Sequence, residues 1–284
     1  MDWLQFEFDY RLDLQRLTPH ILAVEAHKDA ALTRVLPPQW RTPAQPDQAT
    51  AEIADENLQL RLRNSANARA WVNQRFAAGT PLTLADLLIM HGMVADGATG
   101  VYAAGAAGAL RDLPVQVGRR EVGGLHMGAP VNRLQRLMEQ YIGFITSDRL
   151  LNLHPVIQAL IAHFFLVTIH PFGDGNGRVS RLLTAGILLQ RGYNVHGGFY
   201  ALSDYFYLND IKYHSMLHRC WQSPLPFDLT PFVAFGMEGF VMELRSIGSF
   251  MKMKLGRVVD RETLLASHSA PGPRRLRAVR PESR

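Results

Sequence analysis

Apolar side chains recur three or four positions apart along most of this chain, which is the spacing of an amphipathic helix. Thr83 suits the N-cap of one such stretch, because its side-chain oxygen can accept a backbone N–H of the first turn. The pattern therefore predicts a mostly α-helical protein. The expected helices cover residues 10–34, 48–78, 84–93, 131–144, 177–190, 203–222 and 229–257.

One further helix differs because it is apolar on nearly all sides. It runs from His154 to Thr168, with Gln158 and His163 as polar interruptions and Pro155 suited to the first turn. A helix that is apolar all round usually lies at the centre of a bundle. This stretch is too short and too polar to span a bilayer, so we expect a buried helix and no membrane segment.

Two stretches break the helical pattern. Four prolines between Arg34 and Asp47 predict a loop. Residues 95–130 are rich in glycine, and within them Leu113-Pro-Val-Gln-Val-Gly118 is the best strand candidate of the chain. We therefore expect one short β-hairpin near residues 113–122.

The candidate chemistry follows the apolar helix, in the segment His170-Pro-Phe-Gly-Asp-Gly-Asn-Gly-Arg-Val-Ser-Arg181. This glycine-rich turn leads into the N-terminus of a helix, where free N–H groups and the helix dipole favour an anion. Gly173, Gly175 and Gly177 let the backbone approach a bulky ligand and adopt positive φ. The arrangement predicts a loop that binds phosphate groups.

Polar side chains in this loop supply the chemistry. His170 can accept a proton near neutral pH, and Asp174 can hold a hard cation such as Mg²⁺. Arg178 and Arg181 lie three residues apart and share a helical face beside the anion site. Each residue alone is more often structural, but their conjunction favours phosphate transfer. The loop lacks the Gly-x-x-x-x-Gly-Lys-Ser/Thr pattern of a P-loop enzyme.

These residues match every specified position of the Fic family signature, His-Pro-Phe-x-Asp/Glu-Gly-Asn-Gly-Arg-x-x-Arg. The chain resembles that family from about Leu82 to Leu217. Residues 81–91 resemble the opening core helix of the family, 111–118 its flap hairpin, 154–163 its central helix and 203–217 the helix that helps to hold the nucleobase. The resemblance implies a Fic/Fido-like helical bundle with a short β-hairpin flap.

The resemblance also implies an activity, that of a protein adenylyltransferase. Such an enzyme moves AMP from ATP to a Tyr, Thr or Ser hydroxyl of a target protein. His170 would be the general base, Asp174 would bind Mg²⁺ or Mn²⁺, and the target would pair with the flap at 113–118. Phe172 would also anchor the loop in the core. The nucleotide would be bound by Phe172, Gly175, Asn176, Gly177, Arg178, Arg181, Asn209 and Tyr213.

The resemblance has two departures. Val167 stands where relatives often have glutamate. Many Fic proteins also carry an inhibitory Ser/Thr-x-x-x-Glu-Gly/Asn helix, and the nearest segment here is 48–62. Counted from Thr50, the glutamate position is Ala54, whereas Glu56 lies two residues late. We therefore expect internal inhibition to be weak or absent. The alternative is that Glu52 or Glu56 reaches Arg181 through a shifted register.

Composition and charge describe a globular protein. Of the 284 residues, 47% are apolar and 19% are charged. The net charge is +5, but residues 266–284 hold five arginines and one glutamate and so contribute +4. The rest of the chain is nearly neutral, which does not favour a nucleic-acid partner. The single cysteine, Cys220, and an N-terminus without a secretory signal suit the cytoplasm.

We divide the chain into four parts: an N-terminal helical region (1–78), a Fic core (79–222), a C-terminal helical region (223–265) and a basic tail (266–284). The tail is rich in Pro, Gly, Ser and Arg, a composition that predicts disorder. The oligomeric state stays open, a homo-oligomer included.

The same residues leave other reactions open, because the motif does not read the base. These are transfer of UMP, phosphocholine or phosphate, and removal of AMP. A catalytically idle module that holds a peptide on the flap edge is less favoured, because binding alone needs no base such as His170.

Overall fold

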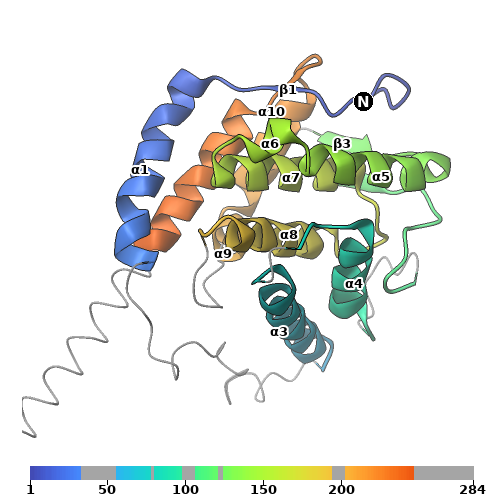
Figure 1. Ribbon diagram of the computed structural model, residues 1–284. Coiled ribbons are helices and arrows are strands. Elements are labelled where there is room, and N and C mark those ends of the chain that lie inside the picture. The colour runs from blue at the N-terminus through green and yellow to red at the C-terminus, as the bar shows by residue number, and fades with distance from the viewer. Residues whose placement is uncertain (33–55, 78–79, 98–105, 121–123, 194–201, 246–284) are drawn as a thin grey trace, which may run out of the picture.

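The computed structural model describes residues 1–32, 56–77, 80–97, 106–120, 124–193 and 202–245. Within these ranges the protein is mostly helical, as the sequence predicts, and its helices gather round one apolar core (Figure 1). A final helix spans residues 230–245. The others are α1 (Leu14–Leu32), α3 (Glu56–Ala77), α4 (Leu84–Ala95), α5 (Leu134–Ile145), α6 (Asp148–Leu151), α7 (Pro155–Ile169), α8 (Asn176–Gln190), α9 (Leu202–Leu208) and α10 (Asp210–Trp221).

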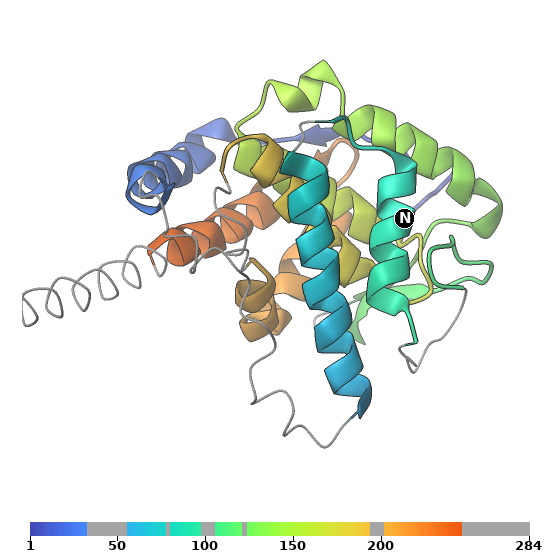
Figure 2. The same cartoon turned by 60° about the horizontal axis from the view of Figure 1, so that its bottom comes forward.

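Helix α7 is the centre of the fold. Every residue from Val156 to Ile169 is buried, which confirms the predicted central helix. Pro155 occupies its first turn, and the His154 side chain caps it by accepting the Val156 N–H at 3.3 Å. Helix α7 packs along α5 and α8, and α3 and α4 pack against α8 from the other side (Figure 2).

The predicted cap of α4 is present and also binds α3. Thr83 Oγ1 accepts the Asp86 N–H at 3.3 Å, while the Asp86 carboxylate accepts the Thr83 N–H at 2.8 Å. Arg75 of α3 donates twice to the same carboxylate, at 2.8 and 2.9 Å. Because Asp86 is buried, this bidentate pair fixes α3 against the start of α4.

Strands β2 (Gln116–Arg119) and β3 (Gly124–Met127) form an antiparallel hairpin in which Val117 lies opposite His126. The hairpin confirms the expected element, but it begins three residues later than the predicted strand and ends at Met127. Glycines mark where a chain can turn without fixing the register of the strands that flank them. The Trp3 indole N–H donates to the Met127 carbonyl at 3.0 Å, so the N-terminal residues are attached to β3.

Two boundaries differ from the sequence expectation. Residues 10–11 are not helical but form β1 (Tyr10–Arg11), which runs parallel to β4 (Phe227–Asp228). The helix expected over 203–222 is interrupted at Asn209, whose backbone and side-chain N–H groups both donate to the Tyr205 carbonyl, at 3.0 and 2.9 Å. The predicted loop at 34–47 and the tail at 266–284 lie outside the described residues.

In the described part of the chain, none of the helices has both the length and the apolar character that crossing a bilayer requires.

Glycine allows the helix over 230–245 to approach α7 closely. A Cβ atom on Gly236 would lie 2.3 Å from Leu160 Cδ2 and 2.8 Å from Leu160 Cδ1. Leu160 is fully buried, so it has no free space into which to move. A Cβ atom on Gly239 would likewise lie 2.3 Å from the Tyr205 ring of α9. These contacts place the last helix directly on the core helix.

We expect Gly236→Ala to lower the free energy of unfolding by about 1–3 kcal/mol, because the added methyl group overpacks against Leu160. Gly143→Ala is the matched control. Gly143 lies in α5 with nothing within 4 Å of an added Cβ, so alanine should gain about 0.4–1 kcal/mol there. Urea unfolding followed by circular dichroism measures both changes. A Gly236→Ala protein as stable as the native one would contradict the packing described.

Candidate active site

The predicted phosphate loop is the turn between α7 and α8. His170 ends α7 in the left-handed region, with φ 54° and ψ 61°, and Gly175 precedes α8 with φ 83°. The left-handed conformation costs a non-glycine residue about 1–2 kcal/mol, so neighbouring groups must hold His170 there. Asn176 closes the turn: its Oδ1 accepts the Phe172 N–H at 2.9 Å and its Nδ2 donates to the Phe172 carbonyl at 2.8 Å.

The end of α7 is buried, so its last carbonyl groups need hydrogen-bond donors from outside the helix. His170 supplies two of these donors and the hairpin segment supplies the other two. The four pairs are His170 N to Leu166 O at 3.0 Å, His170 Nδ1 to Val167 O at 3.1 Å, His126 Nε2 to Thr168 O at 3.1 Å, and Ala129 N to Ile169 O at 3.0 Å. The hairpin is therefore attached to the helix end that carries His170.

Arg111 holds the next part of the turn. Its side chain is buried and donates to the carbonyl groups of His170 at 2.8 Å, Leu113 at 2.7 Å, and Ala129. Its backbone N–H donates to the Pro171 carbonyl at 2.9 Å. Arg111 thus joins the start of the flap segment to the loop. The sequence placed Arg111 only at the edge of the flap, because nothing near it in the chain signals these distant partners.

His170 is oriented as a proton acceptor. Because Nδ1 donates to the Val167 carbonyl, the neutral ring carries its proton on Nδ1 and leaves Nε2 with a free lone pair. Burial lowers the pKa of His170 to about 4; the Val167 hydrogen bond opposes this decrease, and His126 and Arg111 add to it. His170 is therefore neutral at pH 7.

Phe172 lies beneath the loop, fully buried, and does not line the cavity described below. Its ring stacks on His91 of α4, with centroids 4.0 Å apart and planes 9° from parallel. His91 Nδ1 accepts the Gly108 N–H at 3.1 Å, so His91 Nε2–H donates to the Asp174 carbonyl at 3.1 Å. His91 supports the loop from below, a role that its place in an apolar helix does not reveal.

Asp174 lies at the exposed tip of the loop. Its Oδ1 accepts the Gly175 N–H at 2.6 Å, and its Oδ2 lies 3.1 Å from Arg178 Nη2 and 4.0 Å from Arg61 Nη2 of α3. Arg178 also donates to the Val94 carbonyl at 2.6 Å, which places Arg178 on the α4 side of the loop. Among the described residues, no three His, Cys, Asp or Glu side chains gather into a metal site.

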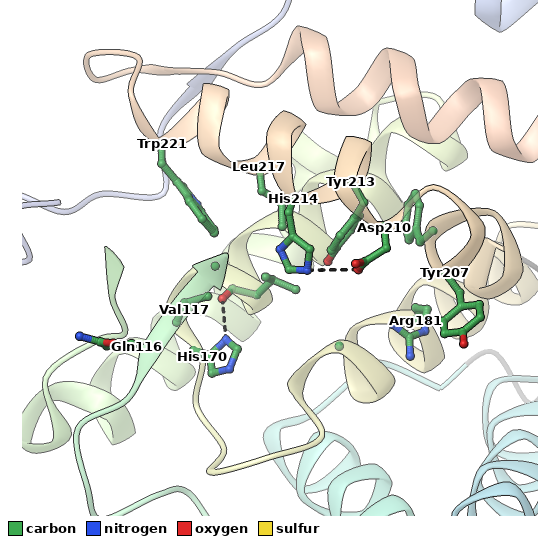
Figure 3. A pocket seen from close by; sticks show the side chains of 14 residues that line it. Gln116, Val117, His170, Arg181, Tyr207, Asp210, Tyr213, His214, Leu217 and Trp221 are labelled. Carbon is green, nitrogen blue, oxygen red and sulfur yellow. Dashed lines mark hydrogen bonds and ion pairs between the residues drawn. The ribbon is translucent and has the colours of Figure 1, made fainter. Parts of the chain in front are cut away.

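A cavity of about 320 Å³ lies on the other side of the loop, between the loop, the hairpin and α9–α10 (Figure 3). Four residues of the predicted site line it, namely His170, Gly177, Arg181 and Tyr213. The base, the first turn of α8 and a cation therefore share one cavity. The other lining residues are Gln116, Val117, Gly118, Val167, Phe206, Tyr207, Asp210, His214, Leu217 and Trp221.

Helix α10 forms the wall across the cavity from the loop. Tyr213 lines this wall, whereas Asn209 begins the helix and is not among the lining residues. Asp210 and His214 face each other on the same wall, with Oδ1 and Nε2 3.4 Å apart (Figure 3). The sequence analysis missed this pair, although acidic and basic side chains four residues apart on a helix are a usable signal.

Helix α3 approaches the loop through Arg61, which agrees with a helix near the loop in this part of the sequence. The segment considered for inhibition, 48–62, is described only from Glu56 onward. Glu52, Ala54 and the side chain of Glu56 lie outside the described residues.

Comparison with known proteins identifies the loop and its surrounding helices. Residues 81–188 match the Fic/DOC family. The protein adenylyltransferase Fic of Drosophila grimshawi is 34% identical over 126 residues, which are 44% of this chain and 24% of the relative. Its counterpart in Culex quinquefasciatus is 38% identical over 112 residues, 39% of this chain and 20% of the relative. The chain thus spans about a quarter or less of the length of these curated relatives.

Solved structures extend the likeness of fold beyond the matched segment. The crystal structure of a Fic family protein from Desulfovibrio desulfuricans aligns with 83% of this chain and 64% of its own, with a TM-score of 0.58 and 23% identity. The match over residues 81–188 includes the complete loop sequence, so this part of the chain is similar to the Fic/DOC family, and the fold of the chain is similar to that of a solved Fic family protein.

Proposed function

We propose that this protein transfers AMP from ATP to a hydroxyl group of a target protein. The observation that supports the proposal most is the cavity shared by His170, Arg181 and the first turn of α8. It combines a neutral base with two features that attract phosphate groups. The adenylyltransferase names of the relatives support AMP as the transferred group.

In the proposed reaction, His170 Nε2 takes the proton of the target hydroxyl while the hydroxyl oxygen attacks the α-phosphorus of ATP. The new oxygen–phosphorus bond forms as the bond from the α-phosphorus to the oxygen that bridges it to the β-phosphorus breaks, and pyrophosphate leaves. Arg181 and the N–H groups at the start of α8 stabilise the negative charge of the phosphates. The Val167 carbonyl holds the imidazole in the reactive tautomer throughout.

The nucleotide contacts divide between direct and supporting residues. Gly177, Arg181 and Tyr213 line the cavity and are proposed to touch the nucleotide, with Gly175 and Arg178 nearer the loop tip. Phe172 and Asn176 shape the loop from within, and Asn209 fixes the start of α10.

Asp174 is proposed to hold Mg²⁺ or Mn²⁺ against the phosphates. Mg²⁺ is usually bound by one or two carboxylates together with phosphate oxygens and waters, so a single carboxylate suffices. The carboxylate keeps acceptor capacity beyond the Gly175 N–H and Arg178 contacts. Bound there, the ion would neutralise phosphate charge during the transfer.

The target is proposed to dock on strand β2. Gln116, Val117 and Gly118 line the cavity, and in the described sheet β2 has β3 as its strand partner on one side. An extended target segment on the other edge would carry its hydroxyl towards His170. We assign the reaction to the cytoplasm because the one cysteine, Cys220, is buried and unpaired. The Fic core at 79–222 is the proposed catalytic unit.

Incubation of the protein with lysate proteins and ATP labelled at either the α- or the γ-phosphate tests the proposal. Label retained on protein only from the α position means AMP transfer. Retention from the γ position would instead indicate phosphate transfer, and no retention from ATP but retention from UTP would indicate UMP transfer.

We expect His170→Ala to lower the transfer rate about 10²–10⁴-fold, because the base acts in the attack and makes no phosphate contact. The dissociation constant of ATP should change little. Labelling kinetics and calorimetric ATP titration measure the two quantities. Undiminished labelling by His170→Ala would falsify the proposed mechanism.

The low pKa of His170 predicts a flat pH profile. The base form is present above a pKa of about 4 and is lost only as the pH falls through that value. We therefore expect kcat/KM to stay nearly constant from about pH 8 to pH 5.5 with excess Mg²⁺. A histidine with the ordinary pKa of about 6.5 would lose about tenfold between pH 7.5 and 5.5. An NMR titration of the His170 ring gives the pKa directly, and a midpoint near 6.5 would contradict the lowered pKa of His170.

We expect Asp174→Ala to raise the Mg²⁺ concentration that gives half-maximal transfer, because the loop loses its carboxylate ligand. High Mg²⁺ or Mn²⁺ should restore part of the rate. Asp148→Ala is the control, since Asp148 is exposed at the start of α6 and does not line the cavity. The prediction is wrong if both variants need the same Mg²⁺ concentration as the native protein.

A further inference from the structure

His163 is the one titratable side chain among the buried residues of α7. It is 0% exposed and lies among the rings of Phe206, Tyr213 and Phe232, with centroid distances of 5.3, 5.9 and 5.8 Å. An apolar side chain would fill this position without the cost of burying a polar group. A histidine here therefore needs a reason other than packing.

The hydrogen bonds around His163 fix the direction of every proton. Ser180 Oγ donates to the Asn176 carbonyl at 2.8 Å, and Thr184 Oγ1 donates to the Ser180 carbonyl at 2.8 Å. The only hydroxyl proton of Thr184 is thus committed. Its 3.3 Å contact with His163 Nδ1 then requires His163 Nδ1–H as the donor.

The tautomer of His163 determines the orientation of Tyr213. With its proton on Nδ1, the neutral ring has Nε2 as an acceptor, and the Tyr213 hydroxyl donates to it at 2.9 Å. Burial, together with the charge of Arg181 and against an opposing hydrogen bond to the Ser180 backbone, lowers the pKa of His163 to about 3, so the acceptor persists at physiological pH. Tyr213 lines the cavity, and its hydroxyl proton points into the core.

This chain of bonds joins two parts of the site that are far apart in the sequence. At one end is Tyr213, on the α10 wall of the cavity. At the other end is the backbone carbonyl of Asn176, a residue whose side chain separately closes the phosphate loop around Phe172. Because a satisfied buried polar network makes one arrangement of the core much better than its alternatives, it can hold the wall at a set position relative to the loop.

We propose that His163 is a positioning residue for nucleotide binding: it holds Tyr213 against the cavity and ties the α10 wall to the phosphate loop through Thr184 and Ser180. The inference rests on the proposed use of the cavity for ATP. His163 does not touch the nucleotide, and it acts through the Tyr213 ring. Its loss affects the affinity for ATP more than the chemical step.

Two substitutions of His163 separate its two hydrogen bonds. A glutamine amide reaches the position of Nε2 and can still accept from Tyr213, whereas an asparagine amide reaches only the position of Nδ1, towards Thr184. Tyr213→Phe removes the hydroxyl group and keeps the ring. These variants, the double variant His163→Asn/Tyr213→Phe and the native chain form the test set.

Calorimetric titration with a non-hydrolysable ATP analogue and Mg²⁺ gives the dissociation constant, and α-label transfer gives kcat. We expect His163→Asn and Tyr213→Phe each to weaken binding about 3–10-fold, the span of one lost hydrogen bond. The double variant should be no weaker than the weaker single variant, because both remove the same link. His163→Gln keeps the bond to Tyr213 and loses the one to Thr184, so it should weaken binding less than His163→Asn does. For all variants kcat should change less than affinity.

Urea unfolding confirms that each variant is folded at the assay temperature. If His163→Asn does not fold, Tyr213→Phe decides the test alone. Unchanged affinity in the folded variants, or fully additive losses in the double variant, would overturn the positioning role and leave the proposed function standing. A native chain that does not bind the analogue would overturn both.

Discussion

The site depends on how a fully buried helix ends. Helix α7 runs through the core to Ile169, where its last carbonyl groups have no water to bind. The fold supplies their donors from His170 itself and from the hairpin segment, at His126 and Ala129. His170 thus takes its orientation from the capping of its own helix, and the hairpin that contains the proposed docking strand β2 is attached to the same end through β3 and the residues that follow it. The same contacts therefore fix both the orientation of His170 and the position of the hairpin.

Some residues of the loop support its shape, and others face the cavity. Phe172 and Asn176 support the loop. They form two hydrogen bonds with each other, and the Phe172 ring stacks on His91. That leaves backbone N–H groups and the side chains of His170 and Arg181 for the cavity. A signature sequence of this kind contains both residues that face the cavity and residues that support the loop. Only the three-dimensional contacts distinguish the two kinds, because both are equally fixed by the motif.

Local signals in the sequence predicted the positions of several elements. Apolar character on all sides located α7, Thr83 located the start of α4, and the contiguous loop located most of the candidate site. The roles of Arg111 and His91 in supporting the loop could not be predicted from the sequence, because their partners lie about 60 and 80 residues away along the chain. The break at Asn209, where backbone and side-chain N–H groups share the Tyr205 carbonyl, is not visible in the spacing of apolar residues. The hairpin lies at other residues than predicted because strand register is decided by tertiary contacts. The proximity of Asp210 and His214 could have been predicted, because side chains four residues apart share one face of a helix.

The attachment of Trp3 to the Met127 carbonyl has a practical meaning for protein engineering. Arg133 also donates to the Trp3 carbonyl, so the first residues are tied to β3 and to the turn that follows it. A purification tag, a fluorescent fusion or a trimmed N-terminus would therefore act on the strand pair beside His170, although these changes are made some 130 residues away in sequence. Assay proteins that differ only in this region are not equivalent reagents, because an effect of the tag on the hairpin would be mistaken for a property of the site.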